Sequence, residues 1–121
     1  LKCATSQIVI GGRSMGGRMC TMAASDEVDP LHVLGVACIG YPLHPPKKPD
    51  KLRTEHFGNL HNPLLFISGT RDEFGTPEEL ELAWKLLPKQ PTVQMIEKGR
   101  HELRGADAQV ADFVAQWLQN L

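Results

Sequence analysis

The chain has 121 residues, of which 41% are hydrophobic, and this is enough to bury the core of one small domain. Its 13 basic and 14 acidic residues nearly balance, which argues against nucleic acid and membrane surfaces as partners. No apolar run approaches the length that crosses a bilayer. We therefore expect one soluble domain that spans residues 1–121.

The first half of the chain predicts two strands with a helix between them. The run QIVI at residues 7–10 is followed by a glycine-rich turn and by a helix-like segment at 15–24. A second apolar run, HVLGVACI, occupies residues 32–39. Short apolar runs bounded by Gly or Pro are typical of strands that are buried on both faces.

The connection at residues 40–63 is far longer than the usual link between two elements. Prolines keep its first half extended, and residues 50–57 favour a short helix that ends at Gly58. Loops of this length usually bind or cover something, so we expect this one to roof part of a substrate pocket.

The second half of the chain predicts two more strands and another helix. The run LLFIS at residues 64–68 reads as a buried strand, and TVQMI at 92–96 alternates as an edge strand does. Between them, the helix at 76–87 opens with Thr76 as N-cap and Glu79 three residues later, which together form a capping box.

The last segment, residues 106–121, repeats apolar residues at intervals of three and four, which indicates an amphipathic helix packed on a core. Because strands alternate with helices, we predict the α/β class with a parallel sheet of about four strands. Helices on both faces of that sheet would give three layers.

The glycine-rich turn reads G-R-S-M-G from Gly12 to Gly16 and stands between the first strand and the first helix. This context is typical of a nucleophile elbow, in which the serine adopts a strained backbone conformation. The flanking glycines are then required because a Cβ at either position would collide with the neighbouring strand or helix. Ser14 is therefore the candidate nucleophile.

A serine hydroxyl needs a base within hydrogen-bond reach, and the base needs an orienting carboxylate. Asp72 follows the third strand and His101 follows the fourth, so both lie at the carboxyl edge of the sheet in the order Ser, Asp, His. We expect Ser14 to attack a carbonyl, His101 to move the proton, and Asp72 to fix the imidazole tautomer.

These assignments have alternatives. Ser14 could instead be an ordinary helix N-cap, and Glu73 could replace Asp72 as the acid. Four other histidines compete with His101, but His101 alone has the required chain order and strand-end position. The competitors are His32, His44, His56 and His61.

Three further residues are candidates for substrate binding. Arg13 could hold an acidic group of a substrate, although we favour a structural ion pair behind the elbow, since a buried guanidinium needs a carboxylate. Tyr41 and His44, in the long connection, are candidates for lining the substrate pocket.

The three cysteines, Cys3, Cys20 and Cys38, are odd in number and lack the spacing of a metal site or a disulfide framework. We expect them to act as small apolar fillers in a reducing compartment, which favours the cytoplasm.

The segments GGRSMGGRM, GYPLHPP, LFISGTRDEFG and GRHEL together resemble the dienelactone-hydrolase-like branch of the α/β-hydrolase superfamily. The resemblance covers essentially the whole chain. It implies that Ser14, Asp72 and His101 form a triad and that the Met15 N–H is one oxyanion donor. It implies neither a metal nor an organic cofactor. Arg100 stands where the family often has an acidic residue.

In that family, further strands precede the elbow strand, and a loop after one of them supplies the second oxyanion N–H. The resemblance therefore implies that this chain is the C-terminal part of a longer hydrolase. Otherwise, another chain would pair along the edge of the strand at residues 7–10. It also implies that the helices at 15–24 and 76–87 share one face, which leaves the other face under-covered by the terminal helix.

The sequence favours a serine hydrolase that cleaves an ester, thioester or similar acyl bond of a small molecule through an acyl-enzyme. One alternative is a non-catalytic interaction module that retains the fold. Another is a flavodoxin-like binder that holds a phosphate at the glycine-rich turn. That binder would need neither Asp72 nor His101, so their placement argues against it.

Overall fold

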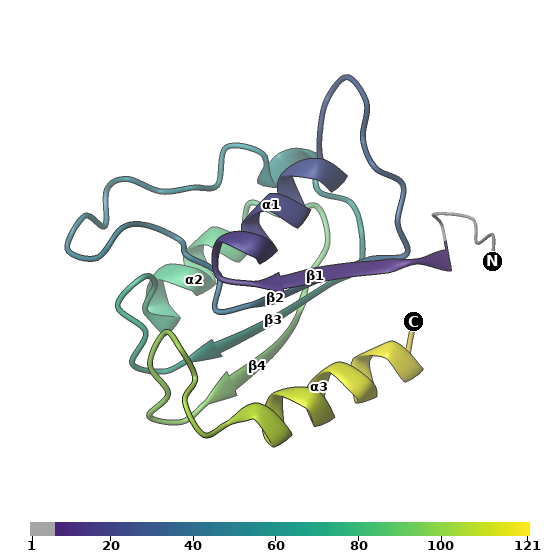
Figure 1. Ribbon diagram of the computed structural model, residues 1–121. Coiled ribbons are helices and arrows are strands. Elements are labelled where there is room, and N and C mark those ends of the chain that lie inside the picture. Colours follow the sequence, from purple (N-terminus) through teal and green to yellow (C-terminus); the bar gives the residue numbers. More distant parts are fainter. Residues whose placement is uncertain (1–6) are drawn as a thin grey trace.

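In the computed structural model, which describes residues 7–121, four strands form one parallel sheet (Figure 1). The strands lie in the order β1-β2-β3-β4. Their bounds are Val9–Arg13 for β1, Gly35–Ile39 for β2, Leu64–Gly69 for β3 and Thr92–Ile96 for β4. All four predicted strands are present, and β4 is at an edge as its alternating pattern indicated.

Three α-helices were predicted, and the described residues contain all three: α1 at Met15–Ala24, α2 at Pro77–Trp84 and α3 at Asp107–Gln119. The capping box of α2 is formed, because Glu79 N donates to Thr76 Oγ1 and Thr76 N donates to the Glu79 carboxylate. Helices α1 and α2 cover one face of the sheet and α3 covers the other (Figure 1). The predicted α/β class and its three layers are confirmed.

Two apolar cores separate these layers. The core under α1 and α2 contains four buried aromatic side chains, Tyr41, Phe57, Phe66 and Trp84, and two of these come from the long connection. The core under α3 is smaller and is centred on Trp117 and on residues of β2 and β3. The long connection therefore builds part of the larger core.

The prediction of a short helix at residues 50–57 is wrong. The structure has instead a 3₁₀ helix, η2, at Phe57–Asn59, and Gly58 lies within it. The backbone of Arg53 is held in another way, since its N–H donates to Leu43 O and its carbonyl accepts from the Tyr41 hydroxyl. These bonds use the backbone N–H and C=O of Arg53, which a helix at residues 50–57 would need for its own hydrogen bonds.

Strand β1 is the other edge of the sheet, and the face beside it is only partly covered. A groove of about 360 Å³ runs between β1 and α3, lined by apolar side chains that include Val9, Ile39, Val114 and Leu118. This agrees with the expected under-covering of that face. Pairing of a further segment or chain with β1 stays a prediction.

The cysteines of the described region are free thiols. Cys38 is fully buried in the larger core and Cys20 packs against it, as expected for apolar fillers. Burial raises the pKa of both thiols. Cys3 lies outside the described residues. Among residues 7–121, no helix is both long enough and apolar enough to span a membrane.

The glycines of the turn differ in their surroundings. A Cβ on Gly12 would lie 2.6 Å from the Gly16 carbonyl carbon and 2.8 Å from Gly17 N, so α1 and β1 touch backbone to backbone there. A Cβ on Gly16 would meet nothing within 4 Å among the described residues. The predicted collision is therefore correct for Gly12 and wrong for Gly16, which points away from the sheet, while Gly17 takes the second crowded position.

The two glycines provide a test of this packing. We expect Gly12→Ala to lower the free energy of unfolding by about 1–3 kcal/mol, because the added methyl overpacks the contact between β1 and α1. We expect Gly16→Ala to raise it by up to about 1 kcal/mol, since alanine favours the helix. Urea unfolding of the full-length protein measures both, and equal losses for the two variants would contradict this packing.

Candidate active site

Ser14 occupies the sharp turn between β1 and α1. Its backbone has φ 49° and ψ −121°, and a positive φ is uncommon for a residue other than glycine. Its N–H donates to Ile39 O at 2.8 Å, which ties the turn to the end of β2. Its side chain forms no capping bond to α1, so the alternative of an ordinary N-cap is not what the structure contains.

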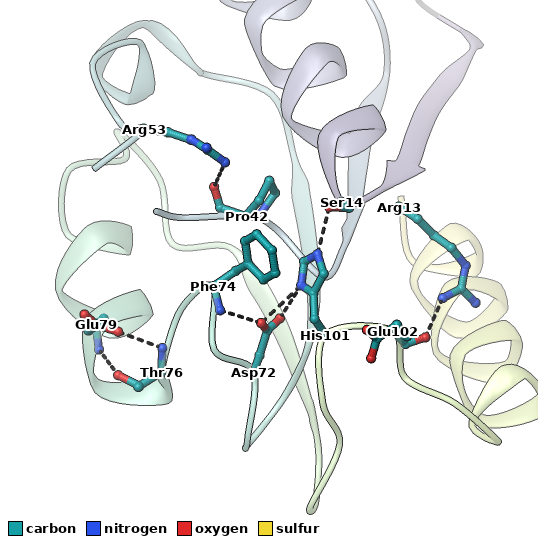
Figure 2. A network of polar contacts seen from close by, with 10 residues as sticks. All are labelled: Arg13, Ser14, Pro42, Arg53, Asp72, Phe74, Thr76, Glu79, His101 and Glu102. Carbon is teal, nitrogen blue, oxygen red and sulfur yellow. Dashed lines mark hydrogen bonds and ion pairs between the residues drawn. The ribbon is translucent and has the colours of Figure 1, made fainter. Parts of the chain in front are cut away.

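The hydroxyl of Ser14 meets the imidazole of His101 (Figure 2). The distance from Ser14 Oγ to His101 Nε2 is 2.8 Å, and His101 Nδ1 lies 2.9 Å from Asp72 Oδ2 and 3.1 Å from Asp72 Oδ1. Because Nδ1 faces two carboxylate oxygens, it is the donor on that side. Nε2 is therefore left to accept the Ser14 proton.

Asp72 is held in the turn that follows β3 and is 2% exposed. Its Oδ1 also accepts from Phe74 N at 2.8 Å, so one carboxylate oxygen has two donors. The neighbouring Glu73 points to solvent. The structure thus brings Asp72, and not Glu73, to the histidine.

Two residues that sequence reasoning missed position the imidazole. The ring of Phe74 stacks on His101 with a centroid distance of 4.0 Å and an interplanar angle of 28° (Figure 2). Gly40, at the end of β2, has φ 65°, and a Cβ there would lie 3.1 Å from His101 O. The glycine directly after a predicted strand was a signal for such a close approach.

The other four histidines lie elsewhere. His32 and His61 are exposed, while His56 Nε2 lies 2.8 Å from Thr21 Oγ1 on α1. His44 is 3% exposed and bonds to Pro45 and Glu79. Of the five histidines, His101 is therefore the one that the structure places against Ser14.

Tyr41 and His44 were candidates for lining a pocket, and the structure places both inside the protein. Tyr41 is 1% exposed, packs edge-on against Phe57 and Phe66, and donates its hydroxyl proton to Arg53 O at 2.8 Å. Both side chains therefore help to hold the long connection onto the body of the domain, together with the bond from His44 N to Phe74 O.

Arg13 forms an ion pair, which is the interpretation that we favoured. Its Nη2 lies 3.1 Å from Asp107 Oδ1 in the first turn of α3. Its Nη1 donates to Glu102 O at 3.4 Å, as Figure 2 shows. Both ionic side chains are largely exposed, so the pair adds little to stability. The bond to Glu102 O links the elbow to the loop that carries His101.

Met15 begins α1, where the first N–H groups of a helix have no acceptor within the helix. Its N–H is therefore available next to Ser14. Within residues 7–121, no group of three or more His, Cys, Asp or Glu side chains is placed to hold a metal ion.

Comparison with known proteins identifies the family and the fold. Residues 1–119 match a family model described as an alpha/beta hydrolase domain. The fold is similar to a monoacylglycerol lipase from Paleococcus ferrophilus, with a TM-score of 0.75 and 14% identity over 93% of this chain and 68% of that chain.

Two further solved structures share the fold. An esterase domain from Rhodothermus marinus has a TM-score of 0.69 and 17% identity over 93% of this chain and 59% of that one. An α/β serine hydrolase without a lid from Xanthomonas campestris has a TM-score of 0.73 and 19% identity over 94% of this chain and 47% of that one. This chain thus spans 47–68% of the length of the three proteins.

The pair of His44 and Glu79, away from the site, gives the stability of the fold a pH dependence. Both ring nitrogens of His44 face oxygen acceptors, Pro45 O at 2.8 Å and Glu79 Oε1 at 2.9 Å, so the cation makes both bonds. Burial lowers the pKa of His44, but the bonds to Glu79 and Pro45 outweigh it and raise the pKa above its ordinary value. The same contact lowers the pKa of Glu79.

Because the pKa of His44 is raised, its charged form stabilises the folded state. This contribution is complete below about pH 6.5 and is lost as the pH rises through the raised pKa. We expect His44→Gln to lower the free energy of unfolding by about 1–3 kcal/mol at pH 6 and by less at pH 9. The exposed His61→Gln is the control. Denaturant unfolding at both pH values measures the effect, and an equal loss at the two would contradict it.

Proposed function

The chain belongs to the family of alpha/beta hydrolase domains, as its sequence resemblance indicated, and on this premise we propose that it is a serine hydrolase. Its substrates are small molecules with an ester, thioester or related acyl bond. Ser14 is the nucleophile, His101 the general base and acid, and Asp72 the residue that orients His101.

One observation carries this proposal: the unbroken chain of contacts from Ser14 Oγ through His101 to the buried Asp72 carboxylate. The three residues come from three separate strand ends, and each is fixed by its own local contacts. A serine that merely caps a helix would direct its oxygen at the first turn of that helix instead.

In the acylation half-reaction, Ser14 Oγ attacks the carbonyl carbon while its proton moves to His101 Nε2. The electron pair of the C=O bond moves onto the oxygen, which the Met15 N–H stabilises. Asp72 stabilises the imidazolium through Nδ1. As the tetrahedral intermediate collapses, Nε2 protonates the leaving group and an acyl-Ser14 ester remains.

In the second half-reaction, His101 takes a proton from water, and the resulting hydroxide attacks the acyl carbonyl. The intermediate expels Ser14 Oγ, which recovers its proton from Nε2. The acid is released and the starting state is restored, so no metal or organic cofactor enters the cycle.

An oxyanion hole has a second donor, and losing one donor costs about a hundredfold to a thousandfold in rate. We assign the second N–H to a segment beyond residues 7–121 that pairs with β1, or to another chain at that edge. Two features support this assignment: β1 is an edge strand, and the apolar groove beside it is open.

The triad predicts a graded loss of activity. On para-nitrophenyl acetate, we expect Ser14→Ala and His101→Ala to lower kcat by about 10⁵-fold or more, and Asp72→Asn by about 10⁴-fold. Asp72→Asn loses less because the nucleophile and the base remain in contact. Steady-state and single-turnover kinetics of the full-length protein measure these losses.

The neighbouring Glu73→Gln is the matched control for Asp72→Asn, because it removes an adjacent carboxylate that faces solvent. It should leave kcat within about twofold. If Glu73→Gln and Asp72→Asn lost equal activity, the assignment of the acid would be wrong. A folded full-length protein without esterase activity on short and long acyl esters would favour the non-catalytic module.

A further inference from the structure

Phe74 connects three segments that meet at the candidate site. Its N–H donates to Asp72 Oδ1 at 2.8 Å, and its carbonyl accepts from His44 N at 3.0 Å. Figure 2 shows its ring beside the imidazole of His101. The backbone of Phe74 is thus bound to the acid on one side and to the long connection on the other, while its ring contacts the base.

The imidazole of His101 is contacted at its edges and on one face. Its two nitrogens contact Ser14 Oγ and the Asp72 carboxylate. The centroid of the Phe74 ring lies 4.0 Å from that of the imidazole, with an angle of 28° between the two planes. Phe74 therefore presents the face of its ring, and not its edge, to the imidazole.

The imidazole changes its charge in the proposed reaction. It is neutral while Nε2 accepts from Ser14, and it becomes a cation when the Ser14 proton moves to it. The face of a phenyl ring carries partial negative charge and attracts a cation within about 6 Å of the ring centroid. The stacked ring therefore favours the charged form of the imidazole over the neutral form.

The charged groups around His101 differ in their exposure. Asp72 is buried and is the one carboxylate within 4.0 Å of a His101 nitrogen among residues 7–121. Burial raises the pKa of Tyr41, so this phenol stays neutral near pH 7. Arg18 is half-buried, and its Nη1 donates to Met15 Sδ. The other charged residues on the adjoining segments are exposed, and water screens them: Arg13, Arg71, Glu73, Lys98, Arg100 and Glu102.

We propose that Phe74 is a positioning residue of this hydrolase, whose ring face orients the imidazole of His101 and stabilises the imidazolium of the transition state. This inference rests on the proposed function and adds a residue to it. Phe74 moves no proton and acts through His101. Its contribution to the rate arises because it binds the charged form of the imidazole more strongly than the neutral form.

Fluorinated phenylalanines separate the charge of the ring face from its shape. In the full-length protein, the phenylalanine at position 74 is replaced by its 4-fluoro, 3,5-difluoro and pentafluoro analogues, which weaken the negative face step by step. We expect kcat/KM on para-nitrophenyl acetate to fall in the same order, by about 3- to 30-fold over the series. The acid limb of the pH profile should move by about 0.5–1.5 units to lower pH, since a less stabilised cation loses its proton more readily.

Coded substitutions and a second phenylalanine are the controls. Phe74→Leu keeps an apolar side chain without an aromatic face, so it should lose rate and move the acid limb to a similar extent. Phe74→Tyr keeps the face and should restore both nearly to the values of the unchanged protein. Phe113 is half-buried like Phe74 but packs on the smaller core, and the same fluorinated series at Phe113 should change neither.

Two results overturn the proposal. One is a rate that does not follow the fluorinated series, or that falls while the acid limb stays in place, because packing alone then explains the effect. The other is an equal trend at positions 74 and 113. If Phe74→Leu does not fold, the fluorinated series decides, since those analogues keep the shape of the ring.

Failure of this inference can be told apart from failure of the proposed function. Hydrolysis that is unchanged across the series overturns the role of Phe74 and leaves the serine hydrolase intact. If no ester is hydrolysed, NMR titration of ¹³C-labelled histidines still tests the stacked pair, and His101→Gln identifies the His101 signal. A midpoint that moves to lower pH along the series supports the proposal, and a fixed midpoint overturns it.

Discussion

The arrangement depends on the close contact between β1 and α1. Because Gly12 and Gly17 have no side chains, the helix lies directly on the strand, and the residue that joins strand to helix must turn sharply. That residue is Ser14, whose positive φ is maintained by the bond from its N–H to Ile39 O and by the helix that follows. The strain aims the hydroxyl at the edge of the sheet instead of at the first turn of α1.

The parallel sheet brings the remaining groups to the same edge. Asp72 and His101 follow β3 and β4, so adjacent strands carry the acid and the base. Gly40, directly after β2, leaves room for the backbone carbonyl of His101. Phe74 covers one face of the ring and its N–H fixes the Asp72 carboxylate. Each contact restricts the imidazole, and Nε2 is left directed at Ser14 Oγ.

Local patterns predicted most of the fold, because the strands, the helices and the capping box at Thr76 and Glu79 depend on neighbours in sequence. The meeting of Ser14, Asp72 and His101 followed from the rule that parallel strands end at one edge. Contacts across the fold were not predictable in this way. The room around Gly16, the burial of Tyr41 and the stacking of Phe74 depend on segments that are distant in sequence. A local sequence pattern does not indicate which distant segments will meet.

The central claim is that the contact with His101 makes Ser14 an activated nucleophile, and covalent trapping tests it most directly. The folded full-length protein is treated with a fluorophosphonate and digested, and the modified residue is located by mass spectrometry. The account predicts one adduct, on Ser14, which forms far more slowly in His101→Ala. An unmodified Ser14, or an adduct on another serine such as Ser25 or Ser68, would contradict it.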